Sequence, residues 1–401
     1  MQLLTTLIYI LLNIRFMKNR LYLVLLLLIP IFSCKNAKVD CEIINYEEPS
    51  EQSLFFSDFV DSIELIQLDS CSDAYLTSDA ILIPHDSSFY VFNRRFLYIG
   101  FAPKAGVVLK FRSDGRFVGL IGDAGSEPGE YLYPSNFFFN SDTLCVVTNR
   151  DKYIHYFKTS GEFITKTPIP YTAFEQVYKY SDNRYLVYLN LNNKIKDERL
   201  VVLDNDGKEV SAFLPKKTKV GRWENSRSVF TKYGNEYMLR EFYIDTIYQY
   251  SPEQGVRPRL RVEFGEKKIY KDKYLKSQGG SEAYVQLLEK PFACIDDFFE
   301  SNNYFIIKIL DNISFNNYRW VYGLKDKTGN QAKWFEFNKE NTFIASSLQY
   351  LDGNKIYFMA QAKNFAKADS NFKGKLKHPE SFEKIDPEGN SVVVVMNLKS
   401  F

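Results

Sequence analysis

The chain has 401 residues, and its 51 Lys and Arg against 49 Asp and Glu give a formal net charge of +2. This near balance argues against a general nucleic-acid binder, which is usually strongly basic. Only three histidines occur, His85, His155 and His378, so the composition also argues against a zinc site or histidine-based acid–base catalysis. An aromatic content of 16% favours β structure, because aromatic side chains suit half-buried pleated surfaces.

The N-terminal segment has the features of an export signal. The basic stretch Met17–Arg20 precedes an apolar run, Leu21–Phe32, which has the length of a signal peptide and is shorter than the roughly 20 residues that span a membrane. Ser33 and Cys34 follow, and the whole arrangement resembles a bacterial lipoprotein signal, in which the cysteine is lipidated and becomes the mature N-terminus. We therefore predict a signal peptide over residues 1–33 and lipidation at Cys34.

The segment after the signal is predicted to be a tether. Met17 is the expected true start, and residues 34–58 form the lipidated N-terminus and a flexible linker. The stretch KNAKVD after Cys34 lacks the acidic cluster that often accompanies export of bacterial lipoproteins to the cell surface. We therefore expect an outer-membrane lipoprotein on the periplasmic side. The four other cysteines can pair in three ways, and spacing does not choose among them. Cys145 and Cys294 lie in apolar runs and are expected to be buried.

A repeated pattern occupies the rest of the chain. Five segments each contain an apolar or aromatic run, a polar turn with glycine and a second run, which is typical of a β-hairpin. The turn glycines are Gly115, Gly161, Gly207, Gly255 and Gly329. Successive glycines are 46, 46, 48 and 74 residues apart. Two further strand candidates precede each hairpin, and a period of about 40–50 residues with four strands predicts a propeller blade.

The sixth unit ends one strand short. Its last strand candidate is NSVVVVMNLK, Asn390–Lys399, and an unused candidate, SIELIQLDS, Ser62–Ser70, precedes the first unit. We predict that this N-terminal strand completes the last blade, with Glu64–Leu68 paired to Val392–Met396. Such pairing closes the ring and removes an open sheet edge.

These features predict an all-β fold, a six-bladed β-propeller of four-stranded antiparallel blades over residues 59–401, with the last blade closed by an N-terminal strand. The stretch GVVLKFRSDGRFVGLIGDAGSEPGEYLYP, Gly106–Pro134, resembles an NHL-repeat hairpin followed by a Gly-rich loop and Pro. With FSDFVDSIELIQLD before the six units and NSVVVVMNLK at the end, the chain resembles the six-bladed β-propeller lipoproteins of Bacteroidetes.

The stretch GDAGSEPGEYLYP, residues 122–134, is predicted to connect the outer strand of the first blade to the inner strand of the second. A P-loop needs Gly-Lys-Ser/Thr before a helix, and an EF-hand needs alternating Asp and a closing Glu; neither pattern is present. Turn chemistry explains nearly every residue of the stretch. The alternative is a ligand contact at the rim by Glu127, Glu130 or Tyr131.

Polar residues near the inner strands are the candidates for a site in the central channel. His85 and His155 fall in different units, which argues against a histidine-rich zinc site. Each acidic candidate is more simply explained as a solvated strand end, because most carboxylates are exposed. The acidic candidates are Asp79, Asp86, Glu175, Asp182, Asp296 and Asp297.

Two other features are candidates for a binding rim. Asn93–Arg95 and Asn149–Asp151 occupy equivalent points of the first two units, where repeated loop chemistry is the simpler explanation and an anion-binding rim is the alternative. Insertions over residues 266–290, with a short helix expected from Ser281 to Lys290, and 363–384 are expected to shape one face of the propeller.

These observations favour a non-catalytic binding or scaffold protein, held at the membrane by its lipid. The expected partner is an envelope protein, a peptide or a glycan, and no nucleic acid. No cofactor loop, metal cluster or nucleophile–base pair is recognisable, so we expect no cofactor, no bound metal and no enzymatic activity. The alternative is a propeller enzyme, a metal-dependent lactonase or other hydrolase or a lyase, with a carboxylate-lined channel.

Overall fold

The computed structural model describes residues 41–49, 56–70, 76, 80–93, 106–149, 151–171, 174–181, 183–189, 196–215, 229–234, 236–241, 245–268, 291–314, 317–329, 332–336 and 348–399. The predicted signal peptide and its Cys34 lie outside these ranges. The chain divides into two units, Met1–Cys41 and Glu42–Phe401, of which the second is described below. Among the helices of the described ranges, none has the length and apolar character needed to cross a bilayer.

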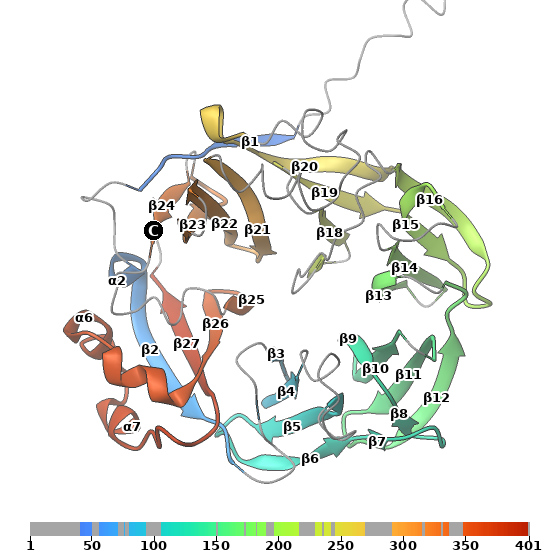
Figure 1. The fold of residues 1–401 in the computed structure, drawn as a ribbon, viewed down its shortest axis with the longest axis horizontal. Helices are drawn as coiled ribbons and strands as arrows, with labels where there is room; N and C mark the ends of the chain where they lie inside the picture. The colour runs from blue at the N-terminus through green and yellow to red at the C-terminus, as the bar shows by residue number, and fades with distance from the viewer. Residues whose placement is uncertain are drawn as a thin grey trace, which may run out of the picture. The chain divides into compact units, whose positions relative to one another are not determined.

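Six antiparallel sheets are arranged as the blades of a propeller, which confirms the predicted fold class (Figure 1). From the inner strand outward, the first three blades are β3 (Ile81–His85), β4 (Ser88–Phe92), β5 (Val108–Arg112) and β6 (Phe117–Ile121); β9 (Pro134–Asn140), β10 (Thr143–Thr148), β11 (Tyr153–Lys158) and β12 (Phe163–Pro168); and β13 (Phe174–Ser181), β14 (Arg184–Leu189), β15 (Glu198–Leu203) and β16 (Glu209–Pro215).

The other three blades follow in the same order around the ring. From the inner strand outward they are β17 (Phe230–Tyr233), β18 (Glu236–Arg240), β19 (Thr246–Ser251) and β20 (Gly255–Glu263); β21 (Phe292–Glu300), β22 (Tyr304–Ser314), β23 (Asn317–Asp326) and β24 (Lys333–Phe335); and β25 (Leu348–Asp352), β26 (Lys355–Ala360), β27 (Val392–Leu398) and β2 (Val60–Gln67).

The predicted hairpin turns lie between the third and fourth strands of the blades. Gly115, Gly161, Gly207 and Gly255 have φ of 91°, 94°, 75° and 67°. These values suit glycine because it has no Cβ to clash with the backbone. Gly329 occupies the corresponding turn of the fifth blade, between β23 and β24.

The N-terminal strand closes the ring as predicted. β2 pairs antiparallel with β27, but the register is one residue earlier than expected, with Ile63 opposite Met396 and Gln67 opposite Val392. Leu68 extends the pairing by one further bond, because its amide donates to the carbonyl of Ser391 at 3.1 Å.

The apolar run of β27 packs the last blade against both of its neighbours in the ring. Successive side chains of a strand point to opposite faces. Val392, Val394 and Met396 join the core shared with the fifth blade, and Val393 and Val395 join the core shared with the first blade. Because both faces are buried, the strand is continuously apolar instead of alternating.

A short strand in the predicted tether was not expected from the sequence. β1, Glu42–Asn45, pairs parallel with Leu260–Glu263 of β20 and becomes a fifth strand of the fourth blade (Figure 1). Ile44 is buried in the core between the fourth and fifth blades. The carbonyl of Asn45 accepts a hydrogen bond from Trp334 Nε1 at 3.0 Å. The propeller fold therefore begins before residue 59, at Glu42.

A buried carboxylate holds the segment after β1. Asp311 has no exposed side-chain surface and accepts a hydrogen bond from the Tyr46 hydroxyl at 2.9 Å. Lys267 and Arg319 approach the same carboxylate at 2.8 and 3.0 Å. Glu48 lies 2.8 Å from Arg319 and 2.9 Å from Lys267. Residues of the N-terminal segment thus close an ion-pair network on the fifth blade.

The insertion over residues 363–384 covers the outer edge of the sixth blade. It contains η5 (Ala362–Lys367), α6 (Ser370–Lys373) and α7 (Pro379–Glu383), which lie beside β2 on the outside of the ring (Figure 1). The Ile63 amide donates to the carbonyl of Lys375 at 2.8 Å, and the Lys377 amide donates to the Ile63 carbonyl at 2.9 Å. Among the described residues the sixth blade has no fifth strand, so the insertion covers the open edge of β2.

Of the other predicted insertion, residues 266–290, only residues 266–268 are described, and η3 (Gly265–Lys267) contains part of them. The helix expected at residues 281–290 lies outside the described residues.

The stretch of residues 122–134 connects β6 to β9, as predicted, through a small parallel bridge between β7 (Asp123–Ala124) and β8 (Glu130–Tyr131). Tyr131 is buried; its hydroxyl accepts from the Val108 amide at 2.9 Å and donates to the Ile121 carbonyl at 2.6 Å. These bonds give Tyr131 a structural role. It is therefore not a ligand contact at the rim.

Candidate functional site

The inner strands of all six blades enclose one cavity at the centre of the ring. Its volume is about 180 Å³. Besides Tyr237 of β18, its walls are formed by Ile81, Ile83, Pro84, His85, Asn136, Phe137, Phe138, Phe139, Gln176, Tyr178, Phe230, Thr231, Lys232, Asp297, Phe299, Glu300, Leu348, Gln349, Tyr350 and Leu351. None of the described residues of the 363–384 insertion lines it, so the expectation that this insertion shapes the site is wrong for this cavity.

Amide side chains of the cavity wall join neighbouring blades. Asn136 of the second blade donates from Nδ2 to the carbonyl of Val177 at 3.0 Å and accepts from the Val177 amide at 3.3 Å. Gln176 of the third blade accepts from the amide of Val229, which precedes β17, at 2.7 Å. These bonds satisfy backbone groups on the open inner edges of the next blade.

Side-chain to backbone hydrogen bonds of the same kind connect two more pairs of neighbouring blades. Gln349 of the sixth blade accepts from the Leu82 amide of the first blade at 3.1 Å, which links the last blade to the first. Thr231 of the fourth blade donates to the carbonyl of Phe298 in the fifth at 2.6 Å. Four neighbouring blade pairs are therefore joined at the channel by side-chain to backbone bonds. These groups serve the ring itself, which leaves fewer polar atoms for a ligand.

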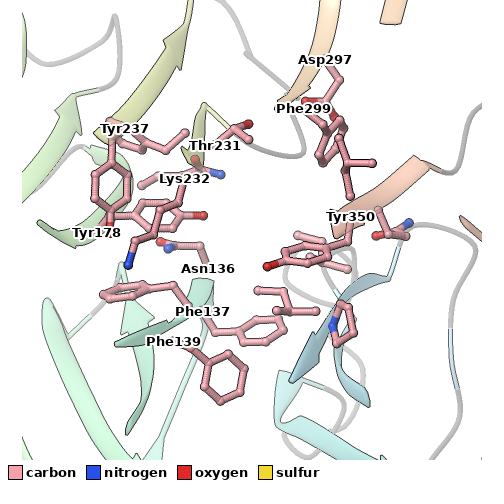
Figure 2. A pocket seen from close by; sticks show the side chains of 18 of the residues that line it. Asn136, Phe137, Phe139, Tyr178, Thr231, Lys232, Tyr237, Asp297, Phe299 and Tyr350 are labelled. Carbon is pink, nitrogen blue, oxygen red and sulfur yellow. The ribbon is translucent and has the colours of Figure 1, made fainter. Parts of the chain in front are cut away.

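Aromatic rings form much of the remaining wall. Figure 2 shows Tyr178 and Tyr237 on one side of the cavity and Tyr350 across from them, with its hydroxyl directed into the space between. The Phe138 ring stacks on Tyr178 with centroids 4.9 Å apart. The Phe139 ring stacks on His85 at 3.8 Å. Such walls suit a ligand with a flat apolar body.

Asp297 is the acidic candidate that lies in the cavity wall. It is 4% exposed, and its Oδ1 accepts from the Phe298 amide at 3.0 Å. Burial raises the pKa of this carboxyl to about 6, against the opposing influence of the nearby cations Arg240 and Lys308. A β-bulge between Ile295 and Asp297 lets two consecutive acidic residues, Asp296 and Asp297, both face cations. The extra residue, Asp296, pairs with Lys308 at 2.6 Å.

Glu300 is a second carboxylate of the wall, and sequence reasoning did not identify it. Its side chain has no exposed surface, and Oε1 receives two cations, Lys327 at 2.7 Å and Arg259 at 3.1 Å. Arg259 belongs to β20 of the fourth blade and Lys327 follows β23 of the fifth, so this ion pair joins two blades. The charge of Glu300 is therefore matched by the protein itself.

Lys232 is the cationic residue of the cavity wall. It is exposed, and its ammonium lies 6.0 Å from the centroid of the Tyr237 ring. No carboxylate within the described part of the chain pairs with it. Figure 2 shows it extending along the wall that carries Tyr178 and Asn136. Lys232 was not a candidate because a single lysine in a strand has no distinguishing sequence signal.

One group of potential metal ligands is found among the described residues. His85, Asp86 and Asp142 place their ligand atoms within 4.8 Å of one another; His85 ends β3, and the two aspartates lie on the turns after β3 and β9. The two carboxylates are exposed, and His85 Nε2 lies 3.4 Å from Asp86 Oδ2. Exposed acidic groups commonly gather in this way on turns, so the cluster by itself does not define a metal site.

The other candidates lie apart from the cavity or outside the described residues. Glu175 is on β13 but does not line the cavity, and His155 is buried on β11, 3.5 Å from Asp151. Burial acts to raise the pKa of Asp151, but the combined effects of the neighbouring His155, Thr148 and backbone lower it overall. Asp79, Asp182, Arg94, Arg95 and Arg150 lie outside the described residues, so the predicted anion-binding rim is not described.

The fold and the cavity define the class of protein: a six-bladed β-propeller whose inner strands enclose a central cavity rich in aromatic side chains. Within that class the chain belongs to the family of the domain of unknown function DUF4934, whose model matches residues 41–397. The matched region begins next to β1, in agreement with a fold that starts at Glu42.

Of the solved structures compared below, the first has the same fold. A protein from Bacteroides fragilis, named as an exported protein, superposes with a TM-score of 0.71 at 17% identity, covering 89% of this chain and all of the other. A DUF4221 member from Bacteroides vulgatus has a TM-score of 0.49 at 11% identity, covering 84% and 98% of the two chains. Virginiamycin B lyase from Staphylococcus aureus has a TM-score of 0.41 at 10% identity, covering 84% and 100%. No curated protein matches the sequence.

Proposed function

We propose that this protein is an exported, lipid-anchored binding protein without catalytic activity, whose central cavity receives one chemical group of a partner in the cell envelope. The observation that carries this proposal is the cavity itself, bounded by all six inner strands and lined by eight Phe and Tyr residues among its 21. A space of about 180 Å³ fits a single ring-sized group, such as a small molecule, one side chain of a peptide or one sugar of a glycan.

The membrane part of the proposal is supported by the sequence pattern before Cys34. The basic stretch, the apolar run and Ser33-Cys34 are typical of a lipoprotein signal. Replacing Cys34 by Ala should move the protein from the membrane fraction to the soluble fraction of the envelope. Unchanged membrane association of the Cys34→Ala protein would contradict lipid anchoring.

The binding part is tested by filling the cavity. Ile83 lies on the cavity wall, and Ile83→Trp places a large ring in that space. The matched control is Val118→Trp on the outer strand β6, where residue 118 is 52% exposed. Because a ligand at 100 times its Kd adds about 2.7 kcal/mol of stability, thermal-shift screening of a fragment library detects binding.

Fragments that bind in the cavity should raise the Tm of the wild type and of Val118→Trp, and leave that of Ile83→Trp unchanged. A fragment that raises the Tm of all three proteins by the same amount binds outside the cavity. If every fragment that binds behaves in this way, the proposed binding cavity is refuted. Far-UV circular dichroism of the three proteins establishes that each retains the β-sheet fold.

A propeller enzyme is the second candidate, and Asp297 is the observation that favours it. A buried carboxyl with a pKa raised to about 6 has the acidity that suits general acid–base catalysis near neutral pH. The two described carboxylates of the wall, Asp297 and Glu300, already face cations, which argues against using them as metal ligands. Turnover of a lactone or glycoside that disappears in Asp297→Asn would favour the enzyme over the binding protein.

A further inference from the structure

We propose that the central cavity selects a small organic carboxylate with a flat apolar body, and that Lys232 binds the carboxylate. This inference rests on the proposed function, because it names the ligand class of the same cavity. Three properties of the wall support it: its unmatched charge, its unused hydrogen-bond donors and its aromatic surface.

The charge of the cavity favours an anion. Lys232 is on the wall and forms no ion pair with any described carboxylate, whereas Glu300 already binds Arg259 and Lys327 through one oxygen. A cationic ligand at Glu300 would be a third cation on one carboxylate. An anion at Lys232 instead supplies the counter-charge that this ammonium lacks, and a hydrogen bond between two charged groups is stronger than a neutral one.

Among its described residues, the wall holds two unused donors, whereas its unpaired acceptor, Glu300 Oε2, belongs to a carboxylate that already pairs with two cations. Gln349 uses Oε1 to bond Leu82, and its Nε2 is buried without a hydrogen-bond partner in the described part of the protein. The Tyr350 hydroxyl is directed into the cavity (Figure 2). Burial raises the pKa of Tyr350, so it remains a neutral donor at physiological pH. Ammonium, amide and phenol donors together match a carboxylate, which has only acceptors.

The size and surface of the cavity indicate what kind of body the carboxylate ligand carries. An engineered apolar cavity of about 150 Å³ is known to bind benzene, so a space of about 180 Å³ admits a benzene-sized ring with a short acidic group. Tyr178, Phe139 and Tyr237 supply ring faces and edges for such a body. Most amides of the wall are engaged between blades, so a ligand rich in hydroxyl groups finds few partners.

The ligand class is tested with compounds that share a ring and differ in charge. Phenylacetate, 2-phenylethanol and phenethylamine carry anionic, neutral and cationic groups on the same body, and glucuronate carries the carboxylate on a sugar ring. Isothermal titration calorimetry of the full mature chain should give the tightest binding for phenylacetate. Equal or tighter binding of phenethylamine would overturn the charge assignment, and tighter binding of glucuronate would overturn the apolar body.

The role of Lys232 is tested by Lys232→Gln, Lys232→Arg and a matched control. Lys166 of β12 is also an exposed strand lysine over a tyrosine ring, at 4.6 Å from Tyr153, but it does not line the cavity. Lys232→Gln should weaken phenylacetate at least tenfold and change 2-phenylethanol less than twofold. Lys232→Arg and Lys166→Gln should bind phenylacetate like the wild type.

Failure of this inference is distinguishable from failure of the proposed function. If Lys232→Gln binds phenylacetate as the wild type does, or if none of the four compounds binds, the anion assignment is wrong. The cavity itself stays a binding site as long as other fragments lose their effect in Ile83→Trp. Because Lys232 is exposed, its replacement should leave the unfolding midpoint unchanged, and a measured midpoint within about 1 °C of wild type establishes that binding, and not folding, was altered.

Discussion

The titration of Asp297 should make the stability of this propeller depend on pH between about 4 and 7. We would replace Asp297 by Asn, which keeps the shape of the side chain and removes its charge. The side chain is buried, with its Oδ1 bonded to the Phe298 amide, so solvent screens its charge little. Any difference in pH dependence between the two proteins then reports the Asp297 carboxyl.

The expected magnitude follows from the pKa of this carboxyl. Burial raises it from 3.8 to about 6, so the folded protein binds the proton more tightly than the unfolded chain does. The stabilisation from that proton is complete below about pH 4 and is lost as the pH rises through 6. A shift of one unit corresponds to 1.36 kcal/mol. The wild type should therefore lose about 3 kcal/mol across this interval through Asp297 alone.

Urea unfolding at pH 4, 5, 6 and 7 measures the effect. The free energy of unfolding of the wild type, relative to that of Asp297→Asn, should fall by about 3 kcal/mol from pH 4 to pH 7, with equal m-values. Asp296→Asn is a second test: this neighbour is 27% exposed and pairs with Lys308, and its charge helps to raise the pKa of Asp297, so its loss should reduce the slope without abolishing it. Parallel pH profiles for the wild type and Asp297→Asn would refute the raised pKa and, with it, the case for acid–base chemistry here.

Two further predictions concern the N-terminal segments. Deleting the chain through Ser70 removes β2 and should abolish the cooperative unfolding transition seen by circular dichroism, because the sixth blade loses its fourth strand; a deletion that unfolds cooperatively would show that the ring closes without β2. Asp311→Ala should lower the free energy of unfolding by about 3–5 kcal/mol, since it leaves Lys267 and Arg319 without their buried partner. Glu48→Ala, at the exposed end of the same network, should cost less than about 1 kcal/mol in the same assay, and equal losses would contradict this ranking.

The six blades were predictable because their signals repeat. A turn glycine every 46 to 48 residues in the first four units marks hairpins that a single unit would leave ambiguous. Closure by β2 was predictable for a related reason: the sixth unit ends one strand short of the repeat, and Ser62–Ser70 is an unused strand candidate before the first unit. The one-residue error in register arose because the pairing continues to Leu68 and Ser391, which the apolar pattern does not reveal.

β1 was missed because four residues carry too little pattern. Glu42–Asn45 has one buried side chain, Ile44, and its pairing depends on the open edge of β20, which exists only in the folded ring. The insertion over residues 363–384 was misplaced for the same reason. Its apolar residues could pack on the rim or on the outside, and the exposed edge of β2 decided between them.

The cavity was only partly predictable. Asp297 was among six acidic candidates, but sequence does not tell which of them face the channel, because strand tilt and the bulge at Asp296 set the direction of each side chain. Tyr178 and Lys232 were not candidates at all. An aromatic residue in an inner strand has the same sequence signature whether it packs between blades or lines a cavity.

The N-terminal strand and the cavity wall are connected by ion pairs. Glu42 of β1 lies 2.6 Å from Lys325 and 3.9 Å from Arg259, and Arg259 in turn lies 3.1 Å from Glu300 in the wall. Lys327 contributes the second cation on Glu300. The segment that would lead to a lipid on Cys34 therefore shares a cation with the cavity wall. Without Glu42, Glu300 would be the remaining carboxylate beside Arg259. The net charge near the cavity wall would then be more positive, which favours binding of an anionic ligand.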